Sequence, residues 1–399
     1  MSELGRRALG RLLEAADSAA ADRLPRAIQE GLSDAGVRAV VLYLSDYDGT
    51  ELRPVPGSTG PQDRAALQDL HSTPAGRSMR ERRLTEGGPE GRCVWTPVTE
   101  RAEPIGVLEL EFEALDDERR RLAVDAGVLV GYLLVTARRY TDFYELLRRR
   151  RPMNLAAEMH WDVLPALSYI GPSIALAGAL EPAYEVGGDA FDYSVNDRIL
   201  DFTILDAMGH GLEAALLSTQ AVAAYRYARR RHESLSETVL TIERVLLRQF
   251  DGNKFVTGLM GLLDLSSGHL RWIAAGHVAP LLLRDGRVRE LANAPLACPM
   301  GLELIDAVRE AEIQLEEGDR VLLYSDGVIE ARAPNGEYLQ LETLVELIQS
   351  SDHRQGIDDL VHALIEEVKK HSAGPLRDDA TLLGIEYLGS SGRTAQTPS

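Results

Sequence analysis

The sequence predicts an α/β protein of two domains, the larger of which is a C-terminal β-sandwich flanked by helices. The chain has 399 residues, which is long for a single domain. After Pro172, apolar runs of strand length are joined by short turns, a pattern typical of antiparallel hairpins. Long stretches of helical character separate these hairpins. That order differs from the regular alternation of a doubly wound parallel sheet.

Composition and charge limit the classes of function. Hydrophobic residues make up 45% of the chain and charged residues 26%, so a sizeable core is available. The net charge of -19 is unevenly spread. Residues 1–150 carry 22 Lys and Arg against 25 Asp and Glu, and the remainder carries 21 against 37. The acidic C-terminal part therefore argues against nucleic acid or an anionic membrane as its main partner.

Cysteine content and hydropathy indicate the compartment. The two cysteines, Cys93 and Cys298, predict free, buried thiols in a reducing environment rather than a disulfide framework. The first residues lack the long apolar core of a secretory signal. No apolar run reaches the roughly 20 residues that a membrane-spanning helix needs. We therefore expect a soluble cytoplasmic protein without a membrane span.

The N-terminal part is predicted to be a small α/β domain of a sensory type. Residues 1–20 have helical periodicity, and residues 56–92 are rich in Gly, Pro, Ser and charge, which favours a loop with one short helix. Two pairs of strands are expected, at residues 37–44 with 51–55 and at residues 93–98 with 105–112.

This N-terminal pattern resembles a GAF domain over about residues 20–135, and we assign residues 1–135 to a GAF-like sensory domain. The resemblance is carried by Ser45-Asp46-Tyr47-Asp48-Gly49-Thr50 after a strand and by Pro104-Ile105-Gly106-Val107-Leu108-Glu109-Leu110. Domains of this family often bind small ligands or dimerise. Cys93 and Trp95 are expected to be core residues rather than ligand contacts.

A helical linker or switch segment is predicted over residues 136–168. Helical character dominates from Leu115 to Leu167, and a basic run, Arg148 to Arg151, precedes Pro152, which should break or restart the helix. One interpretation is a dimerising signal helix followed by a helix that packs on the next domain. The other is a helix within one domain, with solvated arginines.

The C-terminal domain is assigned to residues 169–388, and the small, polar tail 389–399 is expected to be disordered. Hairpin turns are expected at Ser266-Ser267-Gly268 and at Asp285-Gly286. The predicted strands are residues 173–180, 199–205, 255–263, 269–275, 280–284, 320–324 and 381–387, and the predicted helices are residues 212–231, 235–250, 339–349 and 357–371.

Acidic residues recur in this domain where a strand meets a turn. Asp189 follows two glycines, Asp206 ends an apolar run, Asp326 follows another, and Asp378 and Asp379 precede the last strand. Neighbouring glycines let the chain turn closely and leave room for water. Taken singly, each Asp is also compatible with an Asx-turn or a helix cap.

Together these carboxylates suit Mg²⁺ or Mn²⁺. Hard divalent cations prefer oxygen ligands, and two such ions can share a carboxylate and activate a water molecule. Clustered carboxylates repel each other and are therefore stabilised by cations. Zinc is disfavoured because no Cys or His pair has ligand spacing.

Five ordered motifs resemble those of the PPM-type metal-dependent serine/threonine phosphatases, in the bacterial branch typified by stage II sporulation protein E and RsbU. The resemblance spans about residues 150–388. The stretch Met159 to Pro165 is also similar to the helix that precedes the domain in that branch. The motifs are Glu185 to Tyr193, Asp206 to Gly211, Ala275 to His277, Tyr324 to Ala331 and Asp378 to Leu383.

The resemblance implies an αββα sandwich that binds two Mn²⁺ or Mg²⁺ ions. Asp206 should bridge both ions, and Asp206 and Asp189 should act in catalysis through a metal-bound water. No other cofactor is implied. The implied metal ligands are Asp189, Asp206, the backbone carbonyl of Ala207, Asp326 and Asp378, with Asp379 as the alternative to Asp378.

Two histidines of these motifs have less defined roles. His210 is a candidate proton donor to the leaving seryl oxygen, and the alternative is that it stabilises its turn. His277 is expected to fix a loop by hydrogen bonding. Glu330 and Arg332 are expected to be structural, and no arginine can be assigned as a phosphate clamp.

The function implied is hydrolysis of phosphoserine or phosphothreonine by a metal-activated water. The expected substrate is a phosphorylated protein of the anti-sigma-factor antagonist type, the expected assembly is a homodimer, and the N-terminal domain should regulate turnover. Two alternatives stay open. One is a catalytically weak PPM-fold signalling scaffold, and the other is a two-metal phosphodiesterase, which the acidic surface disfavours.

Overall fold

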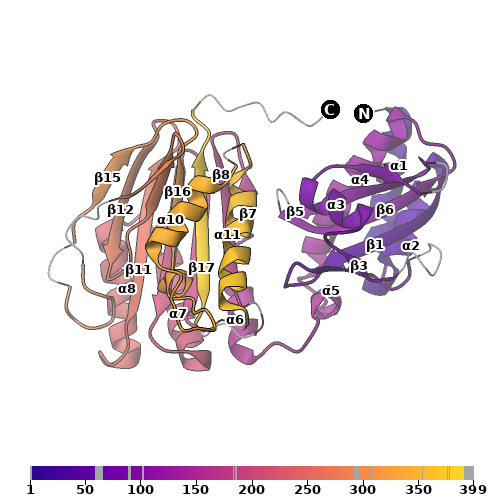
Figure 1. The fold of residues 1–399 in the computed structure, drawn as a ribbon. Helices are drawn as coiled ribbons and strands as arrows, with labels where there is room; N and C mark the ends of the chain where they lie inside the picture. The colour runs from indigo at the N-terminus through magenta and orange to yellow at the C-terminus, as the bar shows by residue number, and fades with distance from the viewer. Residues whose placement is uncertain are drawn as a thin grey trace. The chain divides into compact units, whose positions relative to one another are not determined.

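The computed structural model describes two compact units, which divide after Pro152. The boundary falls inside the segment predicted as a linker. Helices α4 (Asp117–Ala137) and α5 (Phe143–Arg148) belong to the first unit, and α6 (Leu155–Val163) belongs to the second (Figure 1). The described residues are 2–58, 66–88, 91–100, 103–182, 184, 187–291, 297–305, 308–352, 354–374, 376 and 378–390. The predicted tail beyond residue 390 lies outside them.

The first unit is a six-stranded antiparallel sheet with helices on both faces. Helix α1 (Glu3–Asp17) starts where the Ser2 side chain accepts a hydrogen bond from the Gly5 amide. Helices α1, α2 (Leu24–Leu32), α4 and α5 cover one face, and α3 (Pro74–Glu81) covers the other. The strand order is β3 (Gln68–Asp69), β2 (Glu51–Pro54), β1 (Val37–Ser45), β6 (Glu103–Phe112), β5 (Cys93–Glu100) and β4 (Thr85–Gly87).

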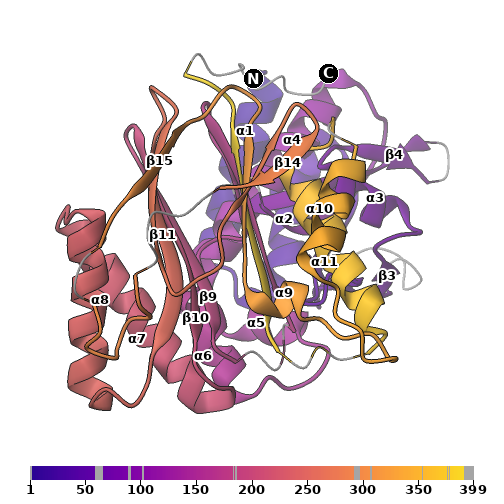
Figure 2. The same cartoon turned by 60° about the vertical axis from the view of Figure 1, so that its left-hand side comes forward.

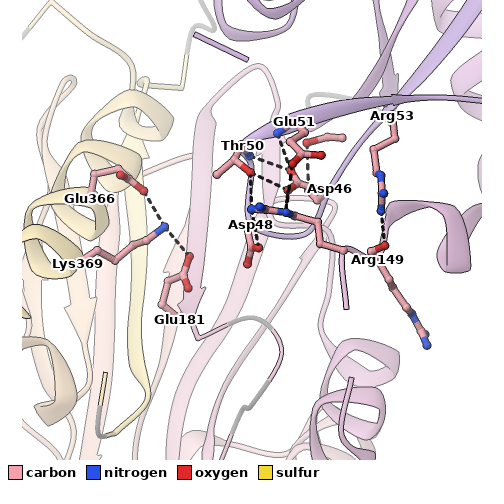
Figure 3. A network of polar contacts seen from close by, with 11 residues as sticks. Asp46, Asp48, Thr50, Glu51, Arg53, Arg149, Glu181, Glu366 and Lys369 are labelled. Carbon is pink, nitrogen blue, oxygen red and sulfur yellow. Dashed lines mark hydrogen bonds and ion pairs between the residues drawn. The ribbon is translucent and has the colours of Figure 1, made fainter. Parts of the chain in front are cut away.

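The basic run that ends the first unit is held by contacts with the turn between β1 and β2. Its arginines are therefore not simply solvated, as one of the two interpretations required. The contacts join Arg148 Nε to the Ser45 carbonyl at 2.9 Å and Arg150 Nε to Glu51 at 3.3 Å. A third contact joins Arg53 to the Arg149 carbonyl (Figure 3).

The second unit contains two antiparallel sheets. The first sheet has the order β15 (Ala311–Gln314), β12 (His269–Ala275), β11 (Val256–Asp264), β10 (Ile199–Ala207) and β9 (Asp189–Asn196). The second sheet has the order β14 (Arg287–Glu290), β13 (Leu281–Arg284), β16 (Arg320–Tyr324), β17 (Ala380–Tyr387), β8 (Ile174–Glu181) and β7 (Ser168–Ile170).

The two sheets pack face to face between two layers of helices, which confirms the predicted αββα sandwich. Phe202 of the first sheet and Leu383 of the second share the central core. Figure 2 shows α7 and α8 outside the first sheet and α10 and α11 outside the second. The helices are α7 (Gly211–Arg230), α8 (Leu235–Phe250), α9 (Asp326–Ile329), α10 (Leu341–Ser350) and α11 (Ile357–Ser372).

The strands and helices predicted for this unit are confirmed to within two residues at each end. Local signals explain the agreement; Ser234 and Glu237, for example, form a reciprocal capping box at the start of α8. Four strands were missed: β7, β9, β14 and β15. All four are short or polar, and β9 begins at Asp189 itself.

Other expectations have mixed outcomes. Cys93 is buried as predicted, but Cys298 is exposed, because it lies in the connection between β14 and β15 rather than in the core. Neither cysteine forms a disulfide. Within the described ranges, none of the helices combines the length and apolarity needed to cross a membrane. The GAF-like nature of the first unit stays a prediction.

Candidate metal centre

Asp189 and Asp206 lie side by side at one end of the first sheet. Asp189 is the first residue of β9, and the register pairs it directly with Asp206 near the end of β10. Side chains alternate between the two faces of a strand. Asp206 therefore points to the same face as Ile204, which belongs to the core between the sheets. Both carboxylates thus lie at the inner edge of the sandwich.

The second sheet brings its acids to the same end. Asp379 precedes β17, and Asp326 begins α9 directly after β16 and Ser325. The Ser325 amide donates to the Thr381 carbonyl at 3.0 Å, and the Thr381 amide donates to Ser325 Oγ at 3.0 Å. Gly327 completes this junction, because a Cβ there would lie 2.0 Å from the Asp379 carbonyl oxygen. The junction fixes the backbone that carries Asp326 and Asp379.

Asp379 connects the two sheets. Its Oδ2 accepts hydrogen bonds from the amides of Gly187 at 2.6 Å and Asp189 at 3.3 Å. Asp379 is buried, whereas Asp378 is exposed and accepts the Asp379 amide on its Oδ1. The two neighbouring acids therefore differ: one is engaged with the backbone of the opposite sheet, and the other has its carboxylate open to solvent.

The glycines before Asp189 allow close backbone approach, which corrects the expectation that they leave room for water. A Cβ on Gly188 would lie 2.3 Å from the Ala207 carbonyl oxygen. The Ala207 amide in turn donates to the Gly188 carbonyl at 3.2 Å. Gly209, by contrast, has a positive φ of 95° and open space around it. Glu185 and Val186, which open the predicted motif, lie outside the described residues.

The carboxylates raise one another's pKa values. Burial, followed by repulsion from Asp326, Asp378 and Asp379, raises the pKa of Asp206 to about 7. Burial and repulsion from Asp206 and Asp379 raise the pKa of Asp189 well above its usual value. Burial also raises the pKa of Asp379, to about 6. Partial burial and the Asp378 carboxylate raise the pKa of Asp326, which lies at the exposed start of α9.

In the described ranges, no basic side chain balances this group of acids. Among the described residues, none of the five carboxylates forms an ion pair. The buried Oδ2 of Asp189 has no hydrogen-bond partner there either. An uncompensated set of carboxylate oxygens is the donor chemistry that a hard divalent cation requires.

The side chains are gathered but not arranged around a common point. Within the part of the chain that the structure describes, no three His, Cys, Asp or Glu side chains have the geometry of a metal site. The structure therefore places Asp189, Asp206 and Asp379 together, with Asp326 and Asp378 near enough to affect Asp206 electrostatically. Their assignment as metal ligands stays a prediction.

The two motif histidines lie in different environments. His210 is exposed at the N-terminal end of α7, and its side chain makes no capping hydrogen bond. His277 is buried after β12, and its Nδ1 lies 3.1 Å from Thr257 Oγ1. That hydroxyl lies 3.5 Å from Asp206 Oδ2. His277 thus contacts a strand next to the acids, whereas His210 is free of such contacts in the described residues.

Sequence reasoning missed two buried polar residues around the acids. Nε2 of His160 in α6 forms a hydrogen bond with the Asp189 carbonyl. Asp192 of β9 accepts hydrogen bonds from Arg226 at 2.7 Å and Arg229 at 2.9 Å. Both residues lie inside stretches that carry the family resemblance, but nothing local indicates their partners on distant elements.

Comparison with known proteins identifies the second unit. Residues 196–388 match the family model of Stage II sporulation protein E (SpoIIE). The chain is 26% identical over 212 residues to the phosphoserine phosphatase RsbU of Bacillus subtilis (strain 168), a match that covers 51% of this chain and 60% of RsbU. It is 22% identical over 192 residues to the phosphoserine phosphatase RsbP of the same organism, covering 47% of each protein.

A solved structure supports the same conclusion. The crystal structure of the RsbU and RsbW domains of Rv1364c from Mycobacterium tuberculosis is 28% identical to this chain, with a TM-score of 0.50. The match covers 55% of this chain and 62% of that one. The chain thus spans less than two thirds of each of these relatives. Over residues 196–388 the second unit is therefore similar to the SpoIIE family, and it shares sequence similarity with RsbU and the fold of a solved relative.

Proposed function

We propose that this protein is a metal-dependent protein serine/threonine phosphatase. The observation that carries the proposal is the gathering of uncompensated carboxylates from both sheets at one end of the sandwich. The two relatives named phosphoserine phosphatases support the same reaction class. The proposed substrate is phosphoserine or phosphothreonine in a regulatory protein of the anti-sigma-factor antagonist type, which is the substrate that the family resemblance implies.

The oxygen donors of these residues suit two Mn²⁺ or Mg²⁺ ions. Asp206, Asp189 and the Ala207 carbonyl would hold one ion, and Asp206, Asp326 and Asp378 would hold the other. When bound, such ions supply an activated water and neutralise charge on phosphoryl oxygens. Asp379 would position Asp189, because its carboxylate holds the Asp189 amide.

Contacts between α6 and the acidic strands support regulation by the first unit. His160 of α6 contacts the Asp189 carbonyl, and Arg226 donates both to the carbonyl of Val163, at the end of α6, and to Asp192. A shift of α6 would therefore move the backbone that carries Asp189. The segment that enters α6 leaves the first unit beside Arg150, where the ion pairs of the basic run hold it.

Exposed side chains on α4 support the proposed homodimer. Val124, Val128 and Tyr132 are 41%, 41% and 54% exposed. Their spacing of four residues places them along one stripe of the helix. Burying this stripe against a second copy would remove apolar surface from water. We place the dimer in the cytoplasm, as expected from the sequence.

The test compares full-length wild type with Asp206→Asn in Mn²⁺, using p-nitrophenyl phosphate, its bis-ester and a phosphoserine protein. We expect monoester hydrolysis to fall more than about 100-fold in the variant, since residues that bind the metal directly matter more than those that orient them. Asp285→Asn, at an exposed hairpin turn of the same unit, is the matched control and should retain activity.

Three results would contradict the proposal. Hydrolysis that survives Asp206→Asn would show that the carboxylates do not form the active centre. Preference for the bis-ester would indicate a phosphodiesterase, and Mn²⁺ binding without hydrolysis of any of the three compounds would indicate a scaffold.

A further inference from the structure

Asp206 has one directly paired residue on each neighbouring strand of the sheet. One of the two is acidic, and the other is Thr257. The register of the first sheet pairs Asp206 with Asp189 of β9 on one side and with Thr257 of β11 on the other. Thr257 Oγ1 lies 3.5 Å from Asp206 Oδ2. A hydroxyl is thus the neutral polar neighbour of the carboxylate that the proposed function places between two ions.

The other contact of this hydroxyl is His277, whose position is fixed by its backbone. His277 Nδ1 lies 3.1 Å from Thr257 Oγ1, and the residue is buried. Gly276 precedes it with a positive φ of 70°, and its amide donates to the Ala297 carbonyl at 2.8 Å. A Cβ on Gly276 would lie 2.6 Å from Pro299 Cγ, so the chain turns there in tight contact. The imidazole is therefore presented to Thr257 from a constrained turn.

Proton counting assigns the direction of these contacts. A threonine hydroxyl has one proton to donate. With the Asp206 carboxylate ionised, as it must be to bind a cation, both contacts of Thr257 can be hydrogen bonds only if His277 Nδ1–H donates to Oγ1 and Oγ1–H donates to Asp206. The Tyr324 carbonyl favours the protonated ring, but the other ring nitrogen, Nε2, is buried without a hydrogen-bond partner in the described residues. That is less costly for an unprotonated acceptor than for a buried N–H group.

We propose that Thr257 and His277 are positioning residues, which hold Asp206 in the orientation needed to bind metal. The inference rests on the proposed function. A hydrogen bond to Oδ2 fixes the rotation of the carboxylate and leaves Oδ1 and the remaining lone pair of Oδ2 for cations. Groups that orient metal ligands in this way typically change metal affinity or activity by about 10- to 100-fold when they are removed.

The test uses two substitutions of Thr257 in the full-length protein. Thr257→Val keeps the shape of the side chain and removes the hydroxyl, whereas Thr257→Ser keeps the hydroxyl. We expect the Kd for Mn²⁺, measured by isothermal titration calorimetry, to rise about 10- to 100-fold in the Val variant. The Ser variant should stay close to wild type.

Substitutions of His277 and of a buried threonine elsewhere distinguish a positioning role of Thr257 from a packing role. His277→Phe should weaken Mn²⁺ binding, and combining it with Thr257→Val should add little, because both break the same chain of hydrogen bonds. Thr203→Val is the matched control. Thr203 is buried on β10 and donates to the Leu259 carbonyl at 3.0 Å, so its loss should leave the Kd for Mn²⁺ unchanged.

The possible outcomes distinguish this inference from the proposed function. Equal Mn²⁺ affinity in wild type and Thr257→Val would overturn the positioning role alone, as would equal losses in the Val and Ser variants. A wild type that binds no Mn²⁺ would overturn the proposed function and this inference with it. Thermal unfolding of each variant in EDTA checks that the second unit is folded before metal is added.

Discussion

The two faces of strand β9 each carry a buried carboxylate, and the surroundings of these two carboxylates are opposite in charge. Asp189 and Asp192 are 3% and 1% exposed and lie three residues apart on the same strand. Asp192 points toward α7 and accepts hydrogen bonds from two arginines of that helix, Arg226 and Arg229. Asp189 points into the other face, where its neighbours are Asp206 and further acids.

One strand therefore carries one acid that stabilises the fold and another for which we propose a role in the site. Burying a charge is costly unless a partner compensates it, and Asp192 has two such partners. Asp189 has no basic partner among the described residues. The Ser325 and Thr381 side chains act to lower its pKa, but burial and the neighbouring acids raise that pKa well above its usual value. A fold retains such an arrangement at a cost in stability, which a bound cation would offset. The ion pairs therefore assign Asp192 to the stability of the fold, and the lack of a basic partner supports the proposed role of Asp189 in the site.

The largest predicted effect contrasts the two acids directly. Asp192→Asn should lower the free energy of unfolding by about 3 kcal/mol, because it leaves Arg226 and Arg229 partly buried without their counter-charge. Asp189→Asn should not destabilise the metal-free protein, because it removes repulsion with Asp206. Urea unfolding in EDTA, with hydrogen exchange of β9 and β10 peptides reporting the second unit, measures both.

Equal destabilisation by the two substitutions would contradict the contrast between Asp189 and Asp192. It would mean that Asp189 has a structural partner as effective as the two arginines of Asp192. Addition of Mn²⁺ sharpens the test. The metal should raise the unfolding free energy of wild type and of Asp192→Asn, but it should have little effect on Asp189→Asn.

The sequence allowed the sandwich to be predicted because its signals are local. Each apolar run, hairpin turn or capping box is formed by residues that are close together in the sequence. The capping box of α8, for example, joins Ser234 and Glu237. The acids at strand ends were found for the same reason. Asp326, for example, follows an apolar run and precedes a glycine, and both features are adjacent in the chain.

What the sequence did not disclose depends on distant contacts. Asp192 is 34 and 37 residues from its two arginine partners, and His160 is 29 residues from the carbonyl that it contacts. Strand β9 was missed because its two acids, Asp189 and Asp192, would lie on opposite faces of a strand. The segment therefore resembles a polar loop. Its strand character comes from pairing with β10, which only the fold supplies.

The second prediction concerns His277, a buried base that is linked to Asp206 through Thr257. Burial lowers the pKa of His277 to about 4, so the folded protein keeps the ring neutral where an unfolded chain would protonate it. Unfolding then takes up a proton between about pH 6.5 and pH 4. Stability should therefore fall as pH falls through this window, by up to about 3 kcal/mol from this residue.

The pH dependence is checked with His277→Gln in urea unfolding at pH 7, 5.5 and 4.5. The unfolding free energies of wild type and variant should converge as pH falls, because the variant lacks the group that must be protonated. His210→Gln, at an exposed position, is the control and should follow wild type throughout. A constant difference between wild type and His277→Gln would show that His277 is not held neutral. The ring could then balance the charge of the acids.

The smallest predicted effect comes from Asp46, a buried acid of the first unit. The backbone amides of Thr50 at 2.8 Å and Glu51 at 3.0 Å satisfy Asp46 Oδ1, while Arg150 is 3.9 Å from Oδ2 and 43% exposed (Figure 3). Because Asp46 depends on amides rather than on the arginine, Arg150→Gln should cost less than about 1 kcal/mol. The cost should shrink further in 0.5 M NaCl, which screens exposed ion pairs.

Urea unfolding in low and high salt, followed by hydrogen exchange of β1 peptides, measures this cost. The control is Arg139→Gln, since Arg139 is exposed and forms no ion pair with any described residue. If Arg150→Gln lowered the free energy of unfolding as much as Asp192→Asn, any arginine near a buried acid would be essential for stability. A small, salt-sensitive loss would instead show that compensation matters in proportion to burial. Asp189, buried without either amide or arginine on its Oδ2, would then be the exception that function explains.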